Sequence, residues 1–171
     1  MKKHILILLL LFLAGTSEEA FCQMTKFKAL FLYNFTQNVE WPPNTISSNE
    51  FIITVVGDDE MAGELEKLAQ VKKVGSKTMV IKQTNQVKEI NDSHVVFLSS
   101  TKSDLMSRLA IQQEGQPVLL ISSKEGLCKD GAAICFTTVD GKLRYQINED
   151  NINARSLKVN NKLISLGIST N

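Results

Sequence analysis

The fold is decided by the stretch from Phe27 to Pro43, which reads FKALFLYNFTQNVEWPP. Large apolar side chains recur in it at every fourth position, at Phe27, Phe31, Phe35 and Val39. This spacing is typical of one face of an α-helix, so we expect that face to be buried. Leu32 and Tyr33 add apolar surface on other sides, which predicts that more than one neighbouring element covers the helix.

The end of this helix is set by Trp41-Pro42-Pro43. Pro42 disfavours the helical conformation at Trp41, and neither proline has an N–H to donate, so the helix is predicted to end near Glu40. Five of the eleven aromatic residues of the chain (8 Phe + 2 Tyr + 1 Trp) lie in this stretch. An apolar stripe of this kind usually packs in the core. The alternative is a face that binds a partner, for which the candidate residues are Phe31, Tyr33, Phe35 and Trp41.

Length and composition are those of one ordinary globular domain. The chain has 171 residues, of which 43% are hydrophobic and 22% are charged. Its formal net charge is +1, so no excess of basic charge points to nucleic acid or to an anionic membrane surface. We therefore expect no nucleic-acid partner.

The first residues have the three parts of a signal peptide. Lys2 and Lys3 precede an apolar run from Ile5 to Ala14, and a polar region follows. The run is about half as long as the roughly 20 residues that a membrane-spanning helix needs. We therefore expect export of the chain from the cytoplasm, and no membrane insertion of the mature chain.

Cleavage of this leader is predicted after Cys22, because small residues stand at suitable positions before it. The chain then divides into a signal peptide, residues 1–22, and a single domain, residues 23–171. Acylation of Cys22 is the alternative, although Phe21 stands where a lipoprotein needs a small residue.

Two cysteines, Cys128 and Cys135, remain after cleavage. Two thiols in an oxidising compartment usually form a disulfide, and a loop this short would stabilise the fold by roughly 2–3 kcal/mol. A redox switch is the open alternative, because strained or exposed bridges are reducible. A zinc site is poorly supported, since His94 is the only histidine of the mature chain and four ligands are usually required.

Apolar runs rich in β-branched residues alternate with helical patterns through the middle of the chain. The runs predict strands at residues 51–56, 78–82, 94–98 and 118–121. One helix is predicted after a cap at Asp58 or Asp59, and another from about Lys102 to Gln113, with Leu105, Leu109 and Gln112 aligned. This alternation indicates an α/β sheet with parallel neighbours.

The C-terminal part has a different pattern. Residues 132–139 and 142–148 predict a β-hairpin joined by Asp140-Gly141, a type I′ turn signal. Residues 151–166 predict one or two short helices that dock on the sheet. The predicted fold is a single α/β domain with a mostly parallel central sheet flanked by helices. Its layers are Rossmann-like without the nucleotide fingerprint, and a C-terminal hairpin and short docking helices complete it.

The residues that could carry chemistry have simpler explanations. Gly57 follows a strand, where a dinucleotide-binding fold has its glycines, but Asp58, Asp59 and Glu60 follow it and would repel a pyrophosphate. These acids suit the dipole of a helix N-terminus. His94 lacks the partners of a catalytic base. We therefore expect no catalytic residue, no cofactor and no metal site, and hence a non-enzymatic binding domain.

The first stretch also carries a family resemblance. Lys28–Phe35 followed by Val39–Pro42 resembles the opening signature of the YfiR-like family of bacterial periplasmic proteins. Later segments resemble the family in the same order: Ile53–Asp58, Asp92–Ser99, Val118–Ser122, Gly131–Phe136, Ile147-Asn148, Asn153–Arg155, Leu157–Val159 and Leu163-Ile164.

The resemblance implies a periplasmic α/β protein without catalysis. Such a protein binds and represses a membrane-bound signalling protein through the periplasmic part of that protein. By resemblance the partner is a diguanylate cyclase, with a sensor kinase as the other candidate, and its repression lowers cyclic-di-GMP and biofilm formation. Family members often form homodimers. The rival hypothesis is a periplasmic small-molecule-binding module with a pocket at the carboxyl ends of the strands.

The cysteines fit the resemblance only in part. Cys128 and Cys135 resemble one cysteine pair of the family. Members often carry a second pair at two positions where this chain has Thr54 and Ser93, so both halves of that presumed bridge are absent together. The resemblance therefore leaves at most one bridge through which the protein could sense redox conditions.

Overall fold

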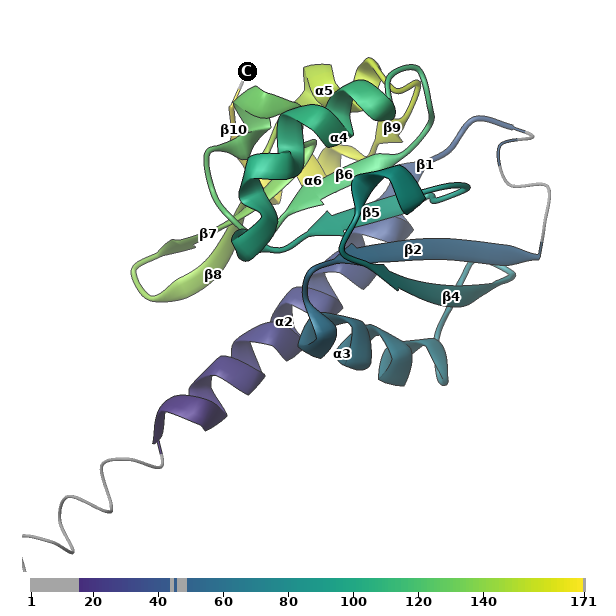
Figure 1. The fold of residues 1–171 in the computed structure, drawn as a ribbon. Helices are drawn as coiled ribbons and strands as arrows, with labels where there is room; N and C mark the ends of the chain where they lie inside the picture. The colour runs from purple at the N-terminus through teal and green to yellow at the C-terminus, as the bar shows by residue number, and fades with distance from the viewer. Residues whose placement is uncertain (1–15, 44, 46–48, 171) are drawn as a thin grey trace, which may run out of the picture.

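The computed structural model describes residues 16–43, 45 and 49–170, with residues 16–22 described only as part of a helix. Its centre is a sheet of eight described strands in the order β10-β8-β7-β6-β5-β2-β4-β3 (Figure 1). These strands are β2 (Glu50–Val56), β3 (Lys73–Val74), β4 (Lys77–Thr84), β5 (Val95–Leu98), β6 (Leu119–Ser122), β7 (Ile134–Val139), β8 (Lys142–Ile147) and β10 (Ile168–Ser169). A separate pair joins β1 (Val39–Glu40) to β9 (Lys158–Val159).

The α-helices described are α2 (Thr16–Asn38), α3 (Asp59–Ala69), α4 (Met106–Gln112), α5 (Glu149–Asn153) and α6 (Asn161–Leu166). Three 3₁₀ helices complete the described elements: η1 (Val87–Glu89), η2 (Ser100–Leu105) and η3 (Leu127–Asp130). The predicted α/β domain with its short C-terminal helices is confirmed.

The middle of the sheet is parallel, as predicted. β2 pairs in parallel with β4 on one side and with β5 on the other, and β5, β6 and β7 continue in parallel. β7 and β8 form the predicted antiparallel hairpin. Asp140 and Gly141 in its turn have φ values of 50° and 71°, as a type I′ turn requires.

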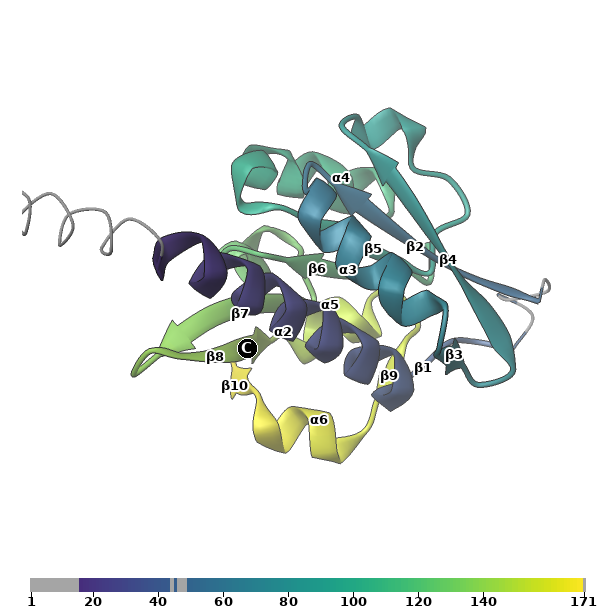
Figure 2. The same cartoon turned by 90° about the horizontal axis from the view of Figure 1, so that it is seen from below.

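Helices cover both faces of the sheet. α2 and α3 lie side by side across one face, and α4 covers the other (Figures 1 and 2). Phe51, Ile53 and Val55 of β2 belong to the core under α2 and α3, whereas Val56 belongs to the core under α4. The two-residue alternation of side chains along a strand therefore divides the interior into two apolar clusters.

The helix predicted from the Phe27–Pro43 stretch differs from the observed helix α2. α2 begins before Phe27 and ends at Asn38, and Val39 is buried in strand β1 instead of the helix. The prediction that Phe27 belongs to the buried face is wrong, since 45% of Phe27 is exposed. An α-helix turns by about 100° per residue, so side chains four apart drift by about 40° at each step. The buried face instead follows Thr25, Ala29, Leu32, Phe35 and Thr36.

The second predicted helix also differs in its details. Residues 100–105 form the 3₁₀ helix η2, and the α-helix begins only at Met106. Its buried side chains are Met106 and Leu109, followed by Gln113 at the C-cap, while Gln112 is exposed. The predicted cap of α3 is confirmed, because Asp58 Oδ1 accepts a hydrogen bond of 2.9 Å from the Met61 N–H.

Most of the predicted signal peptide, residues 1–22, lies outside the described residues, and α2 runs across the predicted cleavage position. Both the leader and its cleavage site stay predictions. Within the described ranges, no helix combines the length and the apolar character needed to cross a bilayer.

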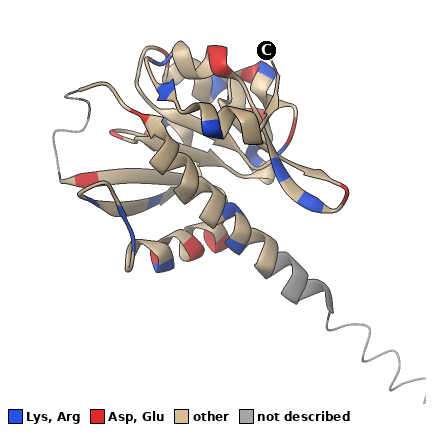
Figure 3. Ribbon diagram, turned by 180° about the vertical axis from the view of Figure 1, so that it is seen from behind, with Lys and Arg blue, Asp and Glu red and all other residues tan. Residues whose placement is uncertain are grey.

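Basic and acidic residues are interspersed over the ribbon (Figure 3).

Candidate functional site

The four predicted partner-binding residues do not form one exposed face. Phe35 is buried, with 1% of its surface exposed, and its ring centroid lies 4.9 Å from that of Tyr145 and 5.8 Å from that of Phe136. Phe31 is partly buried and contacts the same rings edge-on. Phe35 is therefore a core residue, and only the outer edge of Phe31 is available to a partner.

Tyr33 and Trp41 do not share a face with Phe31 and Phe35. The Tyr33 hydroxyl donates a hydrogen bond of 3.2 Å to the Lys73 carbonyl, which ties α2 to β3. Trp41 packs edge-on against Phe51, with ring centroids 5.0 Å apart, beside a cavity of about 360 Å³ that Pro42 and Val74 also line. The structure thus separates Trp41 from Phe31 and Phe35.

A shallow apolar groove runs between α2 and α6. It has a volume of about 180 Å³, and its apolar lining includes Phe31, Tyr145, Leu163 and Leu166. Leu166 is 56% exposed, and the exposed Phe27 lies one helical turn before Phe31. We name Phe27, Phe31 and Leu166 the α2–α6 seam. It is an exposed apolar surface that a partner can reach.

The structure brings the two cysteines together. Both are buried free thiols, and their Sγ atoms lie 2.6 Å apart. The loop that carries Cys128 is held by Asn151, whose Nδ2 donates to the carbonyl oxygens of Cys128 at 2.6 Å and of Ala132 at 2.8 Å. The predicted disulfide between them stays a prediction.

In the reduced form the two thiols are not equivalent. The hydrogen bond with Cys135 lowers the pKa of Cys128, whereas the same contact, together with burial, raises the pKa of Cys135. The thiolate is the form that attacks a disulfide, so the direction of these shifts favours Cys128 over Cys135 as the attacking sulfur.

Thr54 and Ser93, which stand where the resemblance places a second cysteine pair, are also in contact. Thr54 lies in β2, and Ser93 lies two residues before β5. Their hydroxyl oxygens are 2.7 Å apart in a buried hydrogen bond. A hydrogen bond therefore links the two positions where the resemblance places a second cysteine pair.

The carboxyl edge of the sheet is filled by side chains of the chain itself. A methyl group added at Gly57 would come within 2.5 Å of Lys102 Cγ and 3.0 Å of Ser99 Oγ. Lys28 Nζ donates a hydrogen bond of 2.7 Å to Ser123 Oγ, and burial lowers the pKa of Lys28, although the Asp58 carboxylate opposes this shift.

The cavity at this edge has a volume of about 230 Å³, and its lining includes Asp58 and Asp59. The edge where the rival hypothesis places a ligand thus offers a small acidic cavity.

His94 lies at the opposite edge of the sheet. Its Nδ1 accepts a hydrogen bond of 2.9 Å from the Ile52 N–H, and its ring stacks on Phe51 at a centroid distance of 4.8 Å. Sequence reasoning asked only whether His94 is catalytic and missed the cavity of about 520 Å³ beside it, which Lys82 and Gln113 also line. Among the described residues, no cluster of three or more His, Cys, Asp or Glu side chains could hold a metal ion.

A family model described as YfiR/HmsC-like matches residues 25–168. The chain belongs to the YfiR/HmsC-like family. This match covers α2 from Thr25 onward, the sheet except for Ser169, and both cysteines, and it confirms the resemblance. Proteins of the YfiR/HmsC-like family are in general periplasmic regulators without catalysis. Among curated proteins, no match to the chain was found.

Proposed function

We propose that this chain is a non-enzymatic periplasmic regulator that binds and represses a membrane-bound signalling protein. By family likeness the partner is a diguanylate cyclase, whose repression lowers cyclic-di-GMP and biofilm formation. The observation that carries the proposal is the family match over residues 25–168. Two lysines followed by an apolar run at the N-terminus are typical of an export leader, and this pattern supports the periplasmic location.

The α2–α6 seam is our candidate contact surface. Phe27 and Leu166 are large apolar side chains that expose 45% and 56% of their surface. They flank the partly buried Phe31, which packs on the core rings. Exposed apolar side chains around a buried aromatic anchor are typical of protein interfaces.

The loop of Cys128 and Cys135 is the second candidate contact region. Lys129 is exposed between the two cysteines and Asp130 is partly exposed, while Asn151 and the buried cysteines hold the base of the loop. A loop whose base is fixed can present its tip to a partner with little loss of conformational entropy.

The test uses deletion of the gene in the source bacterium, followed by complementation. We expect deletion to raise cyclic-di-GMP and biofilm mass, and the wild-type gene to restore both. The double variant Phe27→Glu/Leu166→Glu should fail to restore them, because it places charges in the seam. Ile111→Glu is the matched control, since Ile111 is 72% exposed and lies on α4, on the opposite face of the sheet.

Crosslinking of the tagged protein in intact cells identifies the partner. We expect a membrane protein with a cyclase domain, or a sensor kinase, to be captured by the wild type and lost with the double variant. Unchanged cyclic-di-GMP after deletion, together with no captured membrane signalling protein, would refute the proposal. Sedimentation of the purified chain tests the homodimer that the family likeness suggests.

A further inference from the structure

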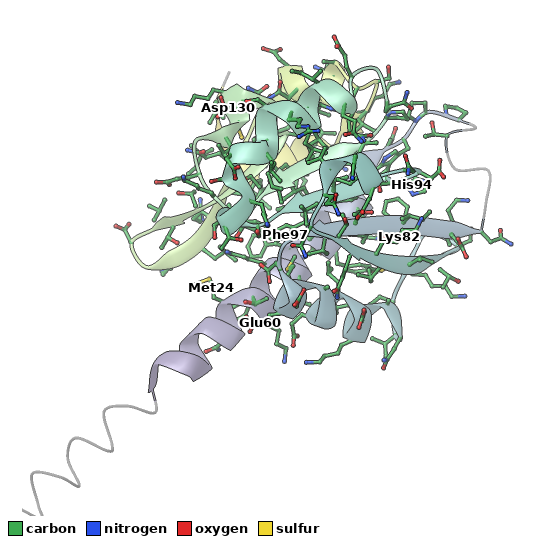
Figure 4. The ribbon with its side chains drawn as sticks, in the orientation of Figure 1. Met24, Glu60, Lys82, His94, Phe97 and Asp130 are labelled. Atoms are coloured by element: carbon green, nitrogen blue, oxygen red, sulfur yellow. The ribbon has the colours of Figure 1, made fainter. Side chains whose placement is uncertain are left out.

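The cavity beside His94 is larger than the three cavities described above, at about 520 Å³. Its volume lies within the range of small-molecule sites, roughly 300–1,000 Å³. It opens at the amino ends of β5 and β6, on the side of the sheet that α4 covers, and its lining includes Ile52, Lys82, Ser93, His94, Gln113 and Val118. Figure 4 labels His94 and Lys82, and both residues line the cavity.

His94 presents a hydrogen-bond donor to this cavity. A backbone N–H can only donate, so Nδ1 must accept from Ile52, and the proton of the neutral imidazole lies on Nε2. Burial lowers the pKa of His94 and keeps the ring neutral at neutral pH. Only 6% of the residue is exposed, and within the described part of the chain Nε2 has no hydrogen-bond partner. The stacking on Phe51 fixes the direction of this donor.

Gln113 is a second buried polar group in the cavity wall. It is 7% exposed, and its backbone N–H bonds to the Leu109 carbonyl at 3.0 Å, but its side-chain amide has no partner among the described residues. The buried side-chain atoms without a partner in the described residues are Trp41 Nε1 and Arg155 Nε, so the Gln113 amide remains open to the cavity that it lines. An occupant of the cavity can therefore form a hydrogen bond to the amide.

Charged side chains at the cavity complete its recognition pattern. Lys82 supplies an ammonium group and Asp92 a carboxylate, and both residues are exposed at its mouth. Ile52 and Val118 supply nearly buried apolar surface. The Nε2–H of His94 and the ammonium of Lys82 suit a carboxylate, and Asp92 suits a neighbouring donor on the ligand.

We propose that this cavity binds a small carboxylic acid that carries an amino or hydroxyl group on the carbon next to the carboxylate. The ligand carboxylate accepts hydrogen bonds from His94 Nε2 and Lys82, and the Gln113 amide bonds to its polar end. A short aliphatic side chain packs on Ile52 and Val118. The site is separate from the α2–α6 seam, and its occupation does not depend on the proposed function.

The test begins with isothermal titration of the purified protein against a panel of 2-amino acids and 2-hydroxy acids of two to six carbons. L-leucine, its 2-hydroxy analogue and 4-methylpentanoate form a matched set within the panel, since the last compound lacks the donor. We expect at least one panel member to bind, and its analogue without the donor to bind at least several-fold more weakly. Inorganic phosphate should not bind, because Asp92 and Glu50 at the cavity repel a second negative charge.

Variants then place the binding in the cavity. Lys82→Ala and Gln113→Leu should each weaken binding by about tenfold or more, the scale of a lost hydrogen bond to a charged group. Lys88→Ala, which removes an exposed lysine outside the cavity, should leave the affinity unchanged.

Trp41 provides a second readout. It is the only tryptophan of the chain, and it packs on Phe51, which stacks on His94. A fluorescence titration should therefore give the same dissociation constant as calorimetry. The proposal is overturned if no panel member binds, if the analogue without the donor binds equally well, or if binding survives Lys82→Ala unchanged.

Discussion

The first helix offers a comparison that tests our account of its packing, because Phe27 and Phe35 are the same residue type in opposite environments. Phe35 is 1% exposed and packs against three aromatic rings at centroid distances of 4.9, 5.8 and 6.1 Å. Truncation of a buried phenylalanine costs about 3–5 kcal/mol, and edge-on ring pairs add about 0.5–1.5 kcal/mol each. We expect Phe35→Ala to lower the free energy of unfolding by about 4–5 kcal/mol.

Phe27→Ala is the matched control, because Phe27 lies two turns earlier on the same helix and is 45% exposed. Partial burial predicts a loss below about 1 kcal/mol. Urea denaturation followed by circular dichroism measures both losses, and the melting temperatures should fall by about 10–15 °C for Phe35→Ala and by about 2–4 °C or less for Phe27→Ala.

Equal losses for the two variants would refute our assignment of the buried face. A partner-binding defect in Phe35→Ala with unchanged stability would likewise show that Phe35 is a contact residue and not part of the core.

Three further predictions concern the polar and sulfur groups of the sheet. The double variant Thr54→Cys/Ser93→Cys should form a disulfide under oxidation, because the native hydroxyl oxygens are 2.7 Å apart. This disulfide should raise the free energy of unfolding by up to about 4 kcal/mol, and dithiothreitol should remove the gain. If oxidation causes no loss of free thiols, this prediction is contradicted. Dithiothreitol should lower the stability of the oxidised wild type by roughly 2–3 kcal/mol through Cys128 and Cys135, and identical melting curves with and without reductant would argue against a bridge. Burial lowers the pKa of His94, so the unfolded state binds more protons below pH about 6.5, and stability should decrease as the pH falls through that value. His94→Gln should remove this pH dependence, and a slope that persists in the variant would assign it to other groups.

The sequence predicts those parts of the fold that local patterns determine. The strands at 51–56 and 118–121 are long apolar runs, and the hairpin turn carries residues that tolerate positive φ, so both were found. The two-residue strands β1, β3, β9 and β10 were not, because their pairing depends on segments that are distant in the chain. The spacing of four in the first helix placed Phe27 on the wrong side, since it neglects the drift of an α-helix.

The polar cavity was missed for a related reason. The helical pattern after residue 100 was read as one continuous helix, which aligned Gln112 with Leu105 and Leu109. Because residues 100–105 form the 3₁₀ helix η2, Leu105 is not on the buried face of α4, which instead follows Met106, Leu109 and Gln113. The only signal of the cavity in the sequence was a glutamine next to the core face of a helix. The residue that lines the cavity with it, His94, comes from a distant part of the chain.

The position of this cavity is explained by the side chains that fill the carboxyl edge of the sheet. In an open α/β sheet, ligands usually bind outside the carboxyl ends of the strands where the connections diverge, here between β2 and β5. Lys102 and Ser99 occupy that point against Gly57, and the bond between Lys28 and Ser123 crosses the same edge. The helix-bearing side of the amino edge is left with the Nε2–H of His94 and the side-chain amide of Gln113, neither of which has a hydrogen-bond partner among the described residues. A small ligand of this protein should therefore bind at the edge opposite to the usual one.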